Sequence, residues 1–136
     1  MRGLTLALAV LAAGGAHAGE LTVTLLGAGP TGAVRVGLFA DAAGFPQHAK
    51  PLAAAAAEPQ GGRAVVRFPD LKPGRYAIAA FQDAKGTGAM VSNFLGMPLE
   101  PYGFSNDANG GLRAPSFDAA AFEVGSDALA LVIHLH

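Results

Sequence analysis

The chain has 136 residues, 51% of them hydrophobic and 14% charged, which is enough apolar material for one domain with one core. The formal net charge is -1 and no segment gathers like charges, so the basic face that nucleic-acid binding requires is missing. The absence of Cys excludes disulfides, thiolate nucleophiles and zinc sites with cysteine ligands, and 19 Gly and 9 Pro leave no room for long helices.

The first part of the chain has the pattern of a secretory signal peptide. Arg2 supplies a positive start, residues 4–13 form an apolar stretch, and Ala16-His17-Ala18 offers small residues at alternate positions to a signal peptidase. The apolar stretch is too short to cross a bilayer, which takes about 20 residues. We therefore expect residues 1–18 to be removed and residues 19–136 to form a single domain, periplasmic or secreted, without a membrane span.

Apolar residues that alternate with other residues predict β-strands over much of the rest of the chain. The predicted strands are separated by turn residues and cover residues 21–25, 34–41, 64–68, 75–82 and 129–135. A further strand is expected within residues 116–124. Several short strands separated by turns predict an antiparallel sandwich or barrel.

An alanine-rich segment, residues 50–58, is ambiguous. It holds five consecutive alanines between Pro51 and Pro59. Alanine favours helix, but one or two turns bounded by proline are marginal alone. A short strand or an irregular edge fits equally well, so the structure of this segment stays open.

The segment Leu71-Lys72-Pro73-Gly74-Arg75-Tyr76 has the spacing of a tyrosine corner. In this motif a buried tyrosine ring fills the core while its hydroxyl group binds backbone a few residues upstream. A plain Pro-Gly turn before a strand tyrosine is the alternative. The corner gives Pro73, Gly74 and Tyr76 a structural role, and it favours an all-β antiparallel sandwich of about seven strands.

The segment from Asp83 to Pro115 is predicted to be one long ordered loop, since connections beyond about 15 residues are uncommon unless they are functional or disordered. It is too apolar for a solvated linker, and polar side chains are interleaved with its aromatic residues. The residues that we expect to contact a ligand are Asp83, Asn93, Glu100, Tyr102, Ser105 and Asn106. Alternatively, four of these residues hydrogen-bond backbone amides and hold the loop in shape, namely Asp83, Asn93, Glu100 and Asn106.

Several strings in and around this loop resemble a known family. They include Gly44-Phe45-Pro46, Asn93-Phe94-Leu95-Gly96 and Tyr102-Gly103-Phe104-Ser105-Asn106. With them, nearly all of residues 19–136 resembles the exported bacterial proteins grouped as domain of unknown function 2141. The resemblance implies a small exported β-sandwich, similar to prealbumin-like and carboxypeptidase-regulatory-like domains, with no established activity.

Two features bear on metals. In many relatives, the strand that ends near Asp83 is followed by an Asp-rich segment that resembles a calcium-binding loop. Here Lys85 and Thr87 occupy two of the positions that would supply oxygen ligands. A lysine beside too few carboxylates opposes Ca²⁺, and no cofactor is expected. His134 and His136 share one face of the last strand and have the spacing of copper or zinc ligands, yet a third ligand is missing from the sequence nearby, so no metal site is assigned. Solvent-facing histidines opposite Leu135 are the alternative.

These features predict a binding or accessory module that uses the 83–115 loop to contact a small molecule, a glycan or a protein. A hydrolytic enzyme that uses Asp83, Glu100 and Asp107 is the alternative, although Ser92 and Ser105 lack the setting of a hydrolase nucleophile and no catalytic residue is assigned. A third alternative is an envelope-associated structural protein that docks a protein partner. A binding module predicts an exposed Tyr102 over a groove, whereas an enzyme predicts two converging carboxyl groups.

Overall fold

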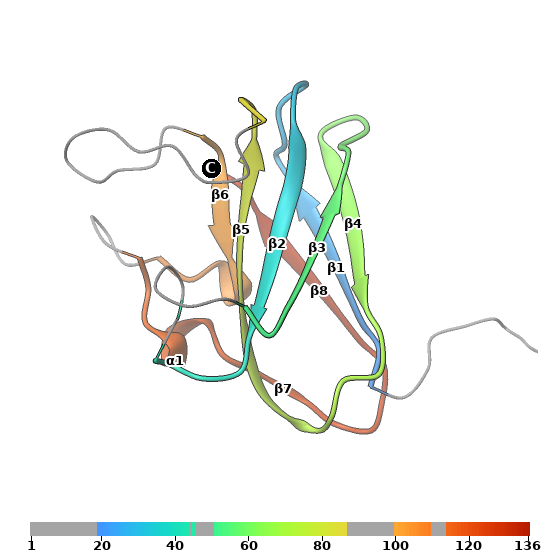
Figure 1. Ribbon diagram of the computed structural model, residues 1–136, viewed down its shortest axis with the longest axis vertical. Helices are drawn as coiled ribbons and strands as arrows, with labels where there is room; N and C mark the ends of the chain where they lie inside the picture. Colours follow the sequence, from blue (N-terminus) through green and yellow to red (C-terminus); the bar gives the residue numbers. More distant parts are fainter. Residues whose placement is uncertain (1–18, 44, 46–50, 87–99, 110–113) are drawn as a thin grey trace, which may run out of the picture.

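Two packed β-sheets form the body of the protein. The computed structural model describes residues 19–43, 45, 51–86, 100–109 and 114–136, and the predicted signal peptide lies outside these ranges. Within them the strands are β1 (Leu21–Leu26), β2 (Ala33–Phe39), β3 (Ala53–Ala57), β4 (Arg63–Phe68), β5 (Gly74–Asp83), β6 (Tyr102–Phe104), β7 (Phe122–Val124) and β8 (Leu129–His134). One sheet has the order β4-β1-β8 and the other β3-β2-β5-β6, with β7 paired to β5 (Figure 1). The predicted β-sandwich is confirmed.

The main core lies between the two sheets and consists of alternate residues of the facing strands. Leu21, Val23 and Leu25 of β1 are fully buried, as are Val34 and Leu38 of β2. Full burial of each such side chain stabilises the fold by about 1.5–3 kcal/mol relative to exposure. The period-2 pattern in the sequence therefore corresponds to the buried faces of the strands.

One strand pair departs from the antiparallel arrangement that the sequence predicted. The amide of Leu129 donates a hydrogen bond to the carbonyl of Glu20, so β8 begins beside the start of β1 and runs parallel to it. The other described pairs are antiparallel. Strand β7 is paired to β5 in the larger sheet, and the chain after it crosses to the smaller sheet. There β8 pairs with β1 in the parallel direction.

The alanine-rich segment forms strand β3 at one edge of the larger sheet (Figure 1). It pairs antiparallel with β2, in a register that runs from Leu38 opposite Ala53 to Val34 opposite Ala57. The edge of β2 offers backbone partners along the whole segment, whereas an isolated helical turn would have to pay for nucleation alone. Packing against a neighbouring strand thus overrides the helix propensity of alanine.

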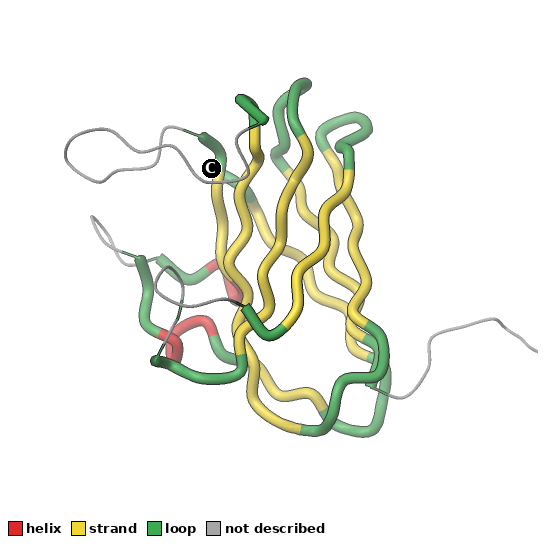
Figure 2. The backbone as a smooth tube through the Cα atoms, in the orientation of Figure 1, coloured by secondary structure: helices red, strands yellow, loops and turns green. Residues whose placement is uncertain are grey.

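Two further expectations are corrected. The predicted 83–115 loop contains the short strand β6, which pairs with β5, and a 3-10 turn over Ser105–Asp107. The strand expected within 116–124 is interrupted by the one-turn helix α1 (Phe117–Ala120), because Ser116 caps it by accepting a hydrogen bond from the Ala119 amide at 3.1 Å. Figure 2 shows the two helical segments close together beside the carboxyl end of β6.

A second, smaller aromatic core covers the outer face of the larger sheet beside these helical segments. Its rings meet edge to face, with centroids 5.3 to 6.1 Å apart around Phe45. Its buried members are Phe39, Phe45, Ala77, Phe104, Phe117 and Ala120. This core fixes β6 and α1 against β5, and it therefore sets the position of the chain that follows β6.

The tyrosine corner is present. The Tyr76 side chain is buried in the main core, and its hydroxyl group donates a hydrogen bond of 2.6 Å to the carbonyl oxygen of Lys72. Pro73 and Gly74 form the turn between the two residues, as the motif requires.

Replacing Tyr76 by phenylalanine should lower the free energy of unfolding by about 1 kcal/mol, because the Lys72 carbonyl loses its donor in a partly buried place. Equilibrium denaturation in urea measures this change. The Tyr102→Phe variant is the control, since the Tyr102 hydroxyl makes no hydrogen bond to a described residue and should be neutral to stability. An unchanged midpoint for Tyr76→Phe would show that the corner bond contributes nothing.

Candidate ligand-binding pocket

Strands β6 and β8 close one edge of the sandwich, although they belong to different sheets. The Tyr102 amide donates to the His136 carbonyl at 3.1 Å, and the His136 amide donates to the Tyr102 carbonyl at 2.9 Å. Two residues that exchange both backbone bonds are directly opposite each other, so their side chains lie on the same face. This pairing places the side chains of Tyr102 and His136 at the same edge of the sandwich.

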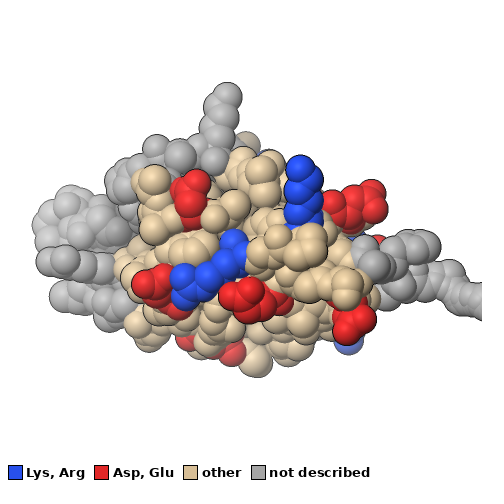
Figure 3. Space-filling view, turned by 90° about the horizontal axis from the view of Figure 1, so that it is seen from below, with Lys and Arg blue, Asp and Glu red and all other residues tan. Residues whose placement is uncertain are grey.

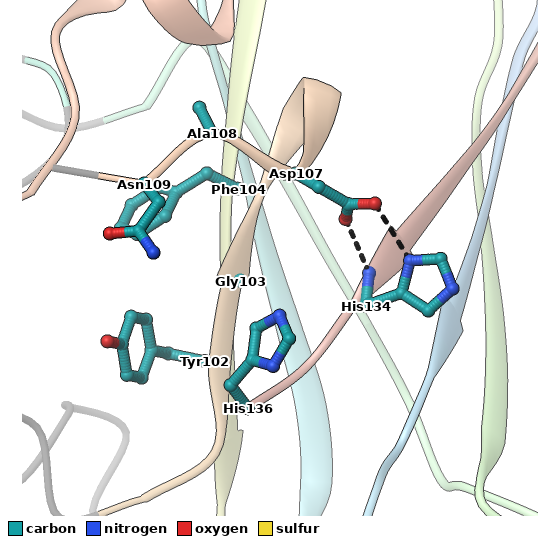
Figure 4. A pocket seen from close by; sticks show the side chains of 8 residues that line it. All are labelled: Tyr102, Gly103, Phe104, Asp107, Ala108, Asn109, His134 and His136. Carbon is teal, nitrogen blue, oxygen red and sulfur yellow. Dashed lines mark hydrogen bonds and ion pairs between the residues drawn. The ribbon is translucent and has the colours of Figure 1, made fainter. Parts of the chain in front are cut away.

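The close approach of β6 to β8 depends on Gly103. A Cβ atom at this position would lie 2.6 Å from the carbonyl oxygen of His134 and 2.9 Å from Cγ2 of Ile133. Real Cβ atoms do not come so near to backbone, and only glycine fits here. The bare backbone of Gly103 lies between the side chains of the neighbouring residues in Figure 4.

The chain after β6 is anchored by Ser105, which is fully buried. Its Oγ accepts a hydrogen bond of 2.9 Å from the Ile78 amide and donates one to the carbonyl of Ala120. Asn106 follows in the left-handed region with φ of 61°, and its Nδ2 donates to the Ala121 carbonyl at 2.8 Å. These bonds tie the 3-10 turn to β5 on one side and to the end of α1 on the other.

Asp107 ties the same turn to β8. Its Oδ1 accepts a hydrogen bond of 2.8 Å from the His134 amide, and its Oδ2 lies 2.8 Å from Nδ1 of the His134 ring (Figure 4). When the imidazole is neutral, the bond to the carboxylate keeps the proton on Nδ1. Both side chains are about half exposed, so the pair is a surface clasp rather than a buried ion pair.

The environment of the clasp changes the acidity of Asp107. Burial acts to raise the pKa of its carboxyl group, but the hydrogen bonds from the amide and the ring of His134 act in the opposite direction. The charges that His134 and His136 carry when protonated add to these bonds, and the pKa of Asp107 is lowered as the net result.

The pKa of Asp107 is lower in the folded protein than in the unfolded chain. Its carboxylate therefore stabilises the fold at pH values above the ordinary pKa of an aspartate, and this stabilisation is lost as the pH falls through the lowered pKa. The Asp107→Asn variant should therefore be less stable than the native protein at neutral pH, by at most about 1 kcal/mol for a solvent-screened pair. Urea denaturation between neutral and acidic pH should show this difference shrinking below about pH 4. The Asp127→Asn variant, at an exposed residue outside the clasp, is the control; a difference that grows in acid would contradict the assignment.

A pocket of about 140 Å³ lies where β6, the end of β8 and the segment after the 3-10 turn meet. Its walls are aromatic and polar, and its lining residues are Tyr102, Gly103, Phe104, Asp107, Ala108, Asn109, His134 and His136 (Figure 4). Tyr102 is only partly buried, whereas Phe104 is buried and shares an edge-to-face contact with it at 5.9 Å. The pocket thus combines a supported aromatic ring with amide, carboxylate and imidazole groups.

Of the residues that the sequence singled out for ligand contact, Tyr102 lines this pocket. Asp83 is 2% exposed and forms an ion pair of 2.8 Å with Nε of Arg35, and Glu100 is 4% exposed and accepts a hydrogen bond from the Lys85 amide. Ser105 and Asn106 also bind groups of the protein itself. Asn93 lies outside the described residues.

Four polar residues of the pocket were not among the predicted ligand contacts. Asp107 and Asn109 belong to the predicted loop, and His134 and His136 attracted attention only by their spacing as metal candidates. Both histidines are exposed while Leu135 between them is buried, as one of the two interpretations expected. Within the described ranges, no three His, Cys, Asp or Glu side chains gather in a way that would hold a metal ion.

On the face that Figure 3 shows, acidic and basic groups are mixed. Arg75 illustrates the pattern, because its Nη1 lies 2.8 Å from Oδ1 of Asp118 and its guanidinium group lies over the Phe117 ring at 5.6 Å. This face therefore offers no basic patch to a polyanion. Among the helices of the described part, none has the length and apolar character needed to cross a membrane.

The fold and the pocket together define a small β-sandwich with an aromatic and polar site at one closed edge. Residues 27–131 match the family described as "Uncharacterized protein conserved in bacteria (DUF2141)", and the chain belongs to this family. The chain has no significant match among curated proteins or solved structures. The matched range includes Tyr102 and Asn109 but ends before His134 and His136.

Proposed function

We propose that this protein is an exported binding module whose ligand occupies the pocket between β6 and the end of β8. The observation that carries the proposal is the partly exposed Tyr102 ring, which lies beside His136 in a pocket that also presents Asp107 and Asn109. An apolar wall with a few converging polar groups is the usual design of a small-molecule site. The signal-peptide pattern of residues 1–18 supports export.

Binding fits this pocket better than hydrolysis does. A hydrolytic site of the predicted kind needs two carboxyl groups that converge on a substrate. The pocket presents the Asp107 carboxylate, and that group already receives two interactions from His134. Asp83 and Glu100 are buried, bind protein groups and do not belong to the lining of this pocket.

The experiment is a thermal-shift screen of the purified protein against sugars, amino acids, amines, carboxylates and divalent metals. A ligand present at 100 times its Kd should stabilise the fold by about 2.7 kcal/mol, which is a readily visible rise in Tm. The His136→Ala variant should lose about half of that rise, because binding weakened about tenfold leaves about 1.4 kcal/mol of stabilisation at the same ligand concentration. The Gln60→Ala variant, at an exposed turn residue outside the pocket, should keep the full rise. A panel without any shift, or a shift that is undiminished in His136→Ala, would contradict the pocket as the site.

Export is tested separately by sequencing the amino terminus of the protein recovered from a bacterium that expresses the whole chain. The proposal predicts Gly19 as the first residue in the periplasmic or extracellular fraction. An uncleaved chain retained in the cytoplasm would contradict it.

A further inference from the structure

We infer that the ligand of this pocket is an uncharged sugar ring that packs one of its faces against Tyr102, an inference that rests on the proposed function. A sugar ring has apolar C–H faces and a rim of hydroxyl groups that both donate and accept hydrogen bonds. It is therefore recognised by an aromatic ring beside a mixed set of donors and acceptors. The pocket provides both.

The aromatic wall is held in a fixed position. Tyr102 and Phe104 point to the same side of β6, and their rings meet at 71° with centroids 5.9 Å apart. Phe104 is itself buried against Phe45, at 6.1 Å, in the second aromatic core. A ring that is already ordered by its neighbours loses little conformational freedom when a ligand packs on it.

The polar groups suit hydroxyl partners. The carboxylate of Asp107 has about four acceptor sites, and the two interactions with His134 leave room for a hydroxyl donor. The neutral His136 imidazole adds one ring nitrogen that donates and one that accepts. Figure 4 shows the side chains of Tyr102, His136, Asp107 and Asn109 around the pocket that they line.

The charge of the pocket favours a neutral ligand. The described residues that line it include no Lys or Arg, so an anion would find a cationic partner among them only in a protonated histidine. Among these described residues the single carboxylate, that of Asp107, is engaged by His134, which reduces the gain for a cationic amine. Bringing an unpaired charge into this pocket would cost desolvation without full compensation, whereas hydroxyl groups would find partners.

The size of the pocket sets the length of the ligand. A volume of about 140 Å³ is small beside the roughly 300–1,000 Å³ of sites that enclose drug-sized molecules. It accommodates a single ring, which is either a free monosaccharide or the end of a glycan chain.

The two tyrosines of the chain make the test specific. The chain contains no Trp, so its intrinsic fluorescence comes from Tyr102 in the pocket and Tyr76 in the tyrosine corner. We expect glucose, galactose, mannose or N-acetylglucosamine to change the tyrosine emission in a saturable way. The response should disappear in Tyr102→Phe and remain in Tyr76→Phe, which is the matched control.

Affinity is measured alongside by calorimetry on the same purified proteins. The Tyr102→Phe variant keeps an aromatic ring and should still bind the sugar, while His136→Ala should weaken binding by about tenfold, the effect of one lost hydrogen bond. A short oligosaccharide that ends in the preferred sugar distinguishes a free monosaccharide from the end of a glycan chain as the natural ligand. Tighter binding of the oligosaccharide indicates a glycan end, and equal binding indicates the free sugar.

Acetate and methylamine are the charged probes of the same series. If either binds through Tyr102 and His136 while every sugar fails, the ligand class is wrong and the proposed function stands. If no sugar or charged probe binds and the thermal-shift panel is also silent, both proposals are overturned. A sugar response that disappears in Tyr76→Phe and persists in Tyr102→Phe also overturns both, because the site then lies elsewhere.

Discussion

Replacing Gly103 by alanine should lower the free energy of unfolding by about 1–3 kcal/mol or more, the usual cost of forcing an extra methyl group into a packed place. The new Cβ atom would lie 2.6 Å from the His134 carbonyl oxygen, which is backbone and cannot turn away as a side chain would. Strands β6 and β8 would have to separate, and the Tyr102–His136 pair that forms the pocket would separate with them. Equilibrium urea denaturation and a sugar titration measure both consequences.

The matched control for this substitution is Gly125→Ala. Nothing lies within 4 Å of a Cβ atom at this glycine, and its φ is not in the left-handed region. It should therefore fold with unchanged or slightly raised stability, since alanine reduces the freedom of the unfolded chain. Equal stability of the two variants would show that the contact between β6 and β8 is loose and that the pocket is not fixed by it.

The Ser105→Ala variant should lose about 2–4 kcal/mol of unfolding free energy. The serine is fully buried, and its hydroxyl group is both the acceptor for the Ile78 amide and the donor to the Ala120 carbonyl. Its removal leaves two backbone groups without partners in a place that water does not reach, and each such group costs about 1–3 kcal/mol. Thermal and urea denaturation should agree on the loss.

The control for this change is Ser126→Ala, at an exposed serine between β7 and β8. Its effect should stay within about 0.5 kcal/mol, as is usual for surface substitutions away from special features. If Ser105→Ala were equally mild, the 3-10 turn would be held by Asn106 and Asp107 alone. Ligand affinity in Ser105→Ala then reports whether the turn still shapes the pocket.

The parts of the fold that follow from local patterns were predictable. The alternation of Leu21, Val23 and Leu25 predicts a strand with one buried face, and the spacing from Lys72 to Tyr76 predicts the corner bond that the structure contains. These signals depend on residues only a few positions apart. The helix α1 also had a local signal, the cap residue Ser116, but the apolar residues around it obscured it.

The parts that depend on distant pairing were not predictable. Asp107 and His134 are 27 positions apart, and nothing in either segment shows that they form a clasp. The parallel pairing of β1 with β8 is equally non-local, and it carries the end of the chain to β6. The composition of the pocket follows from these pairings, which is why the sequence indicated Tyr102 as a ligand contact but indicated the histidines only as metal candidates.

Proton NMR of the two tyrosine rings, during titration with the sugar that stabilises the protein most, tests the central claim most directly. We expect the ring signals of Tyr102 to shift progressively and to saturate, because the ligand packs on that ring at the meeting point of β6 and β8. The signals of Tyr76, which is buried between the sheets, should stay in place. Stationary Tyr102 signals in the presence of a bound ligand would contradict the account.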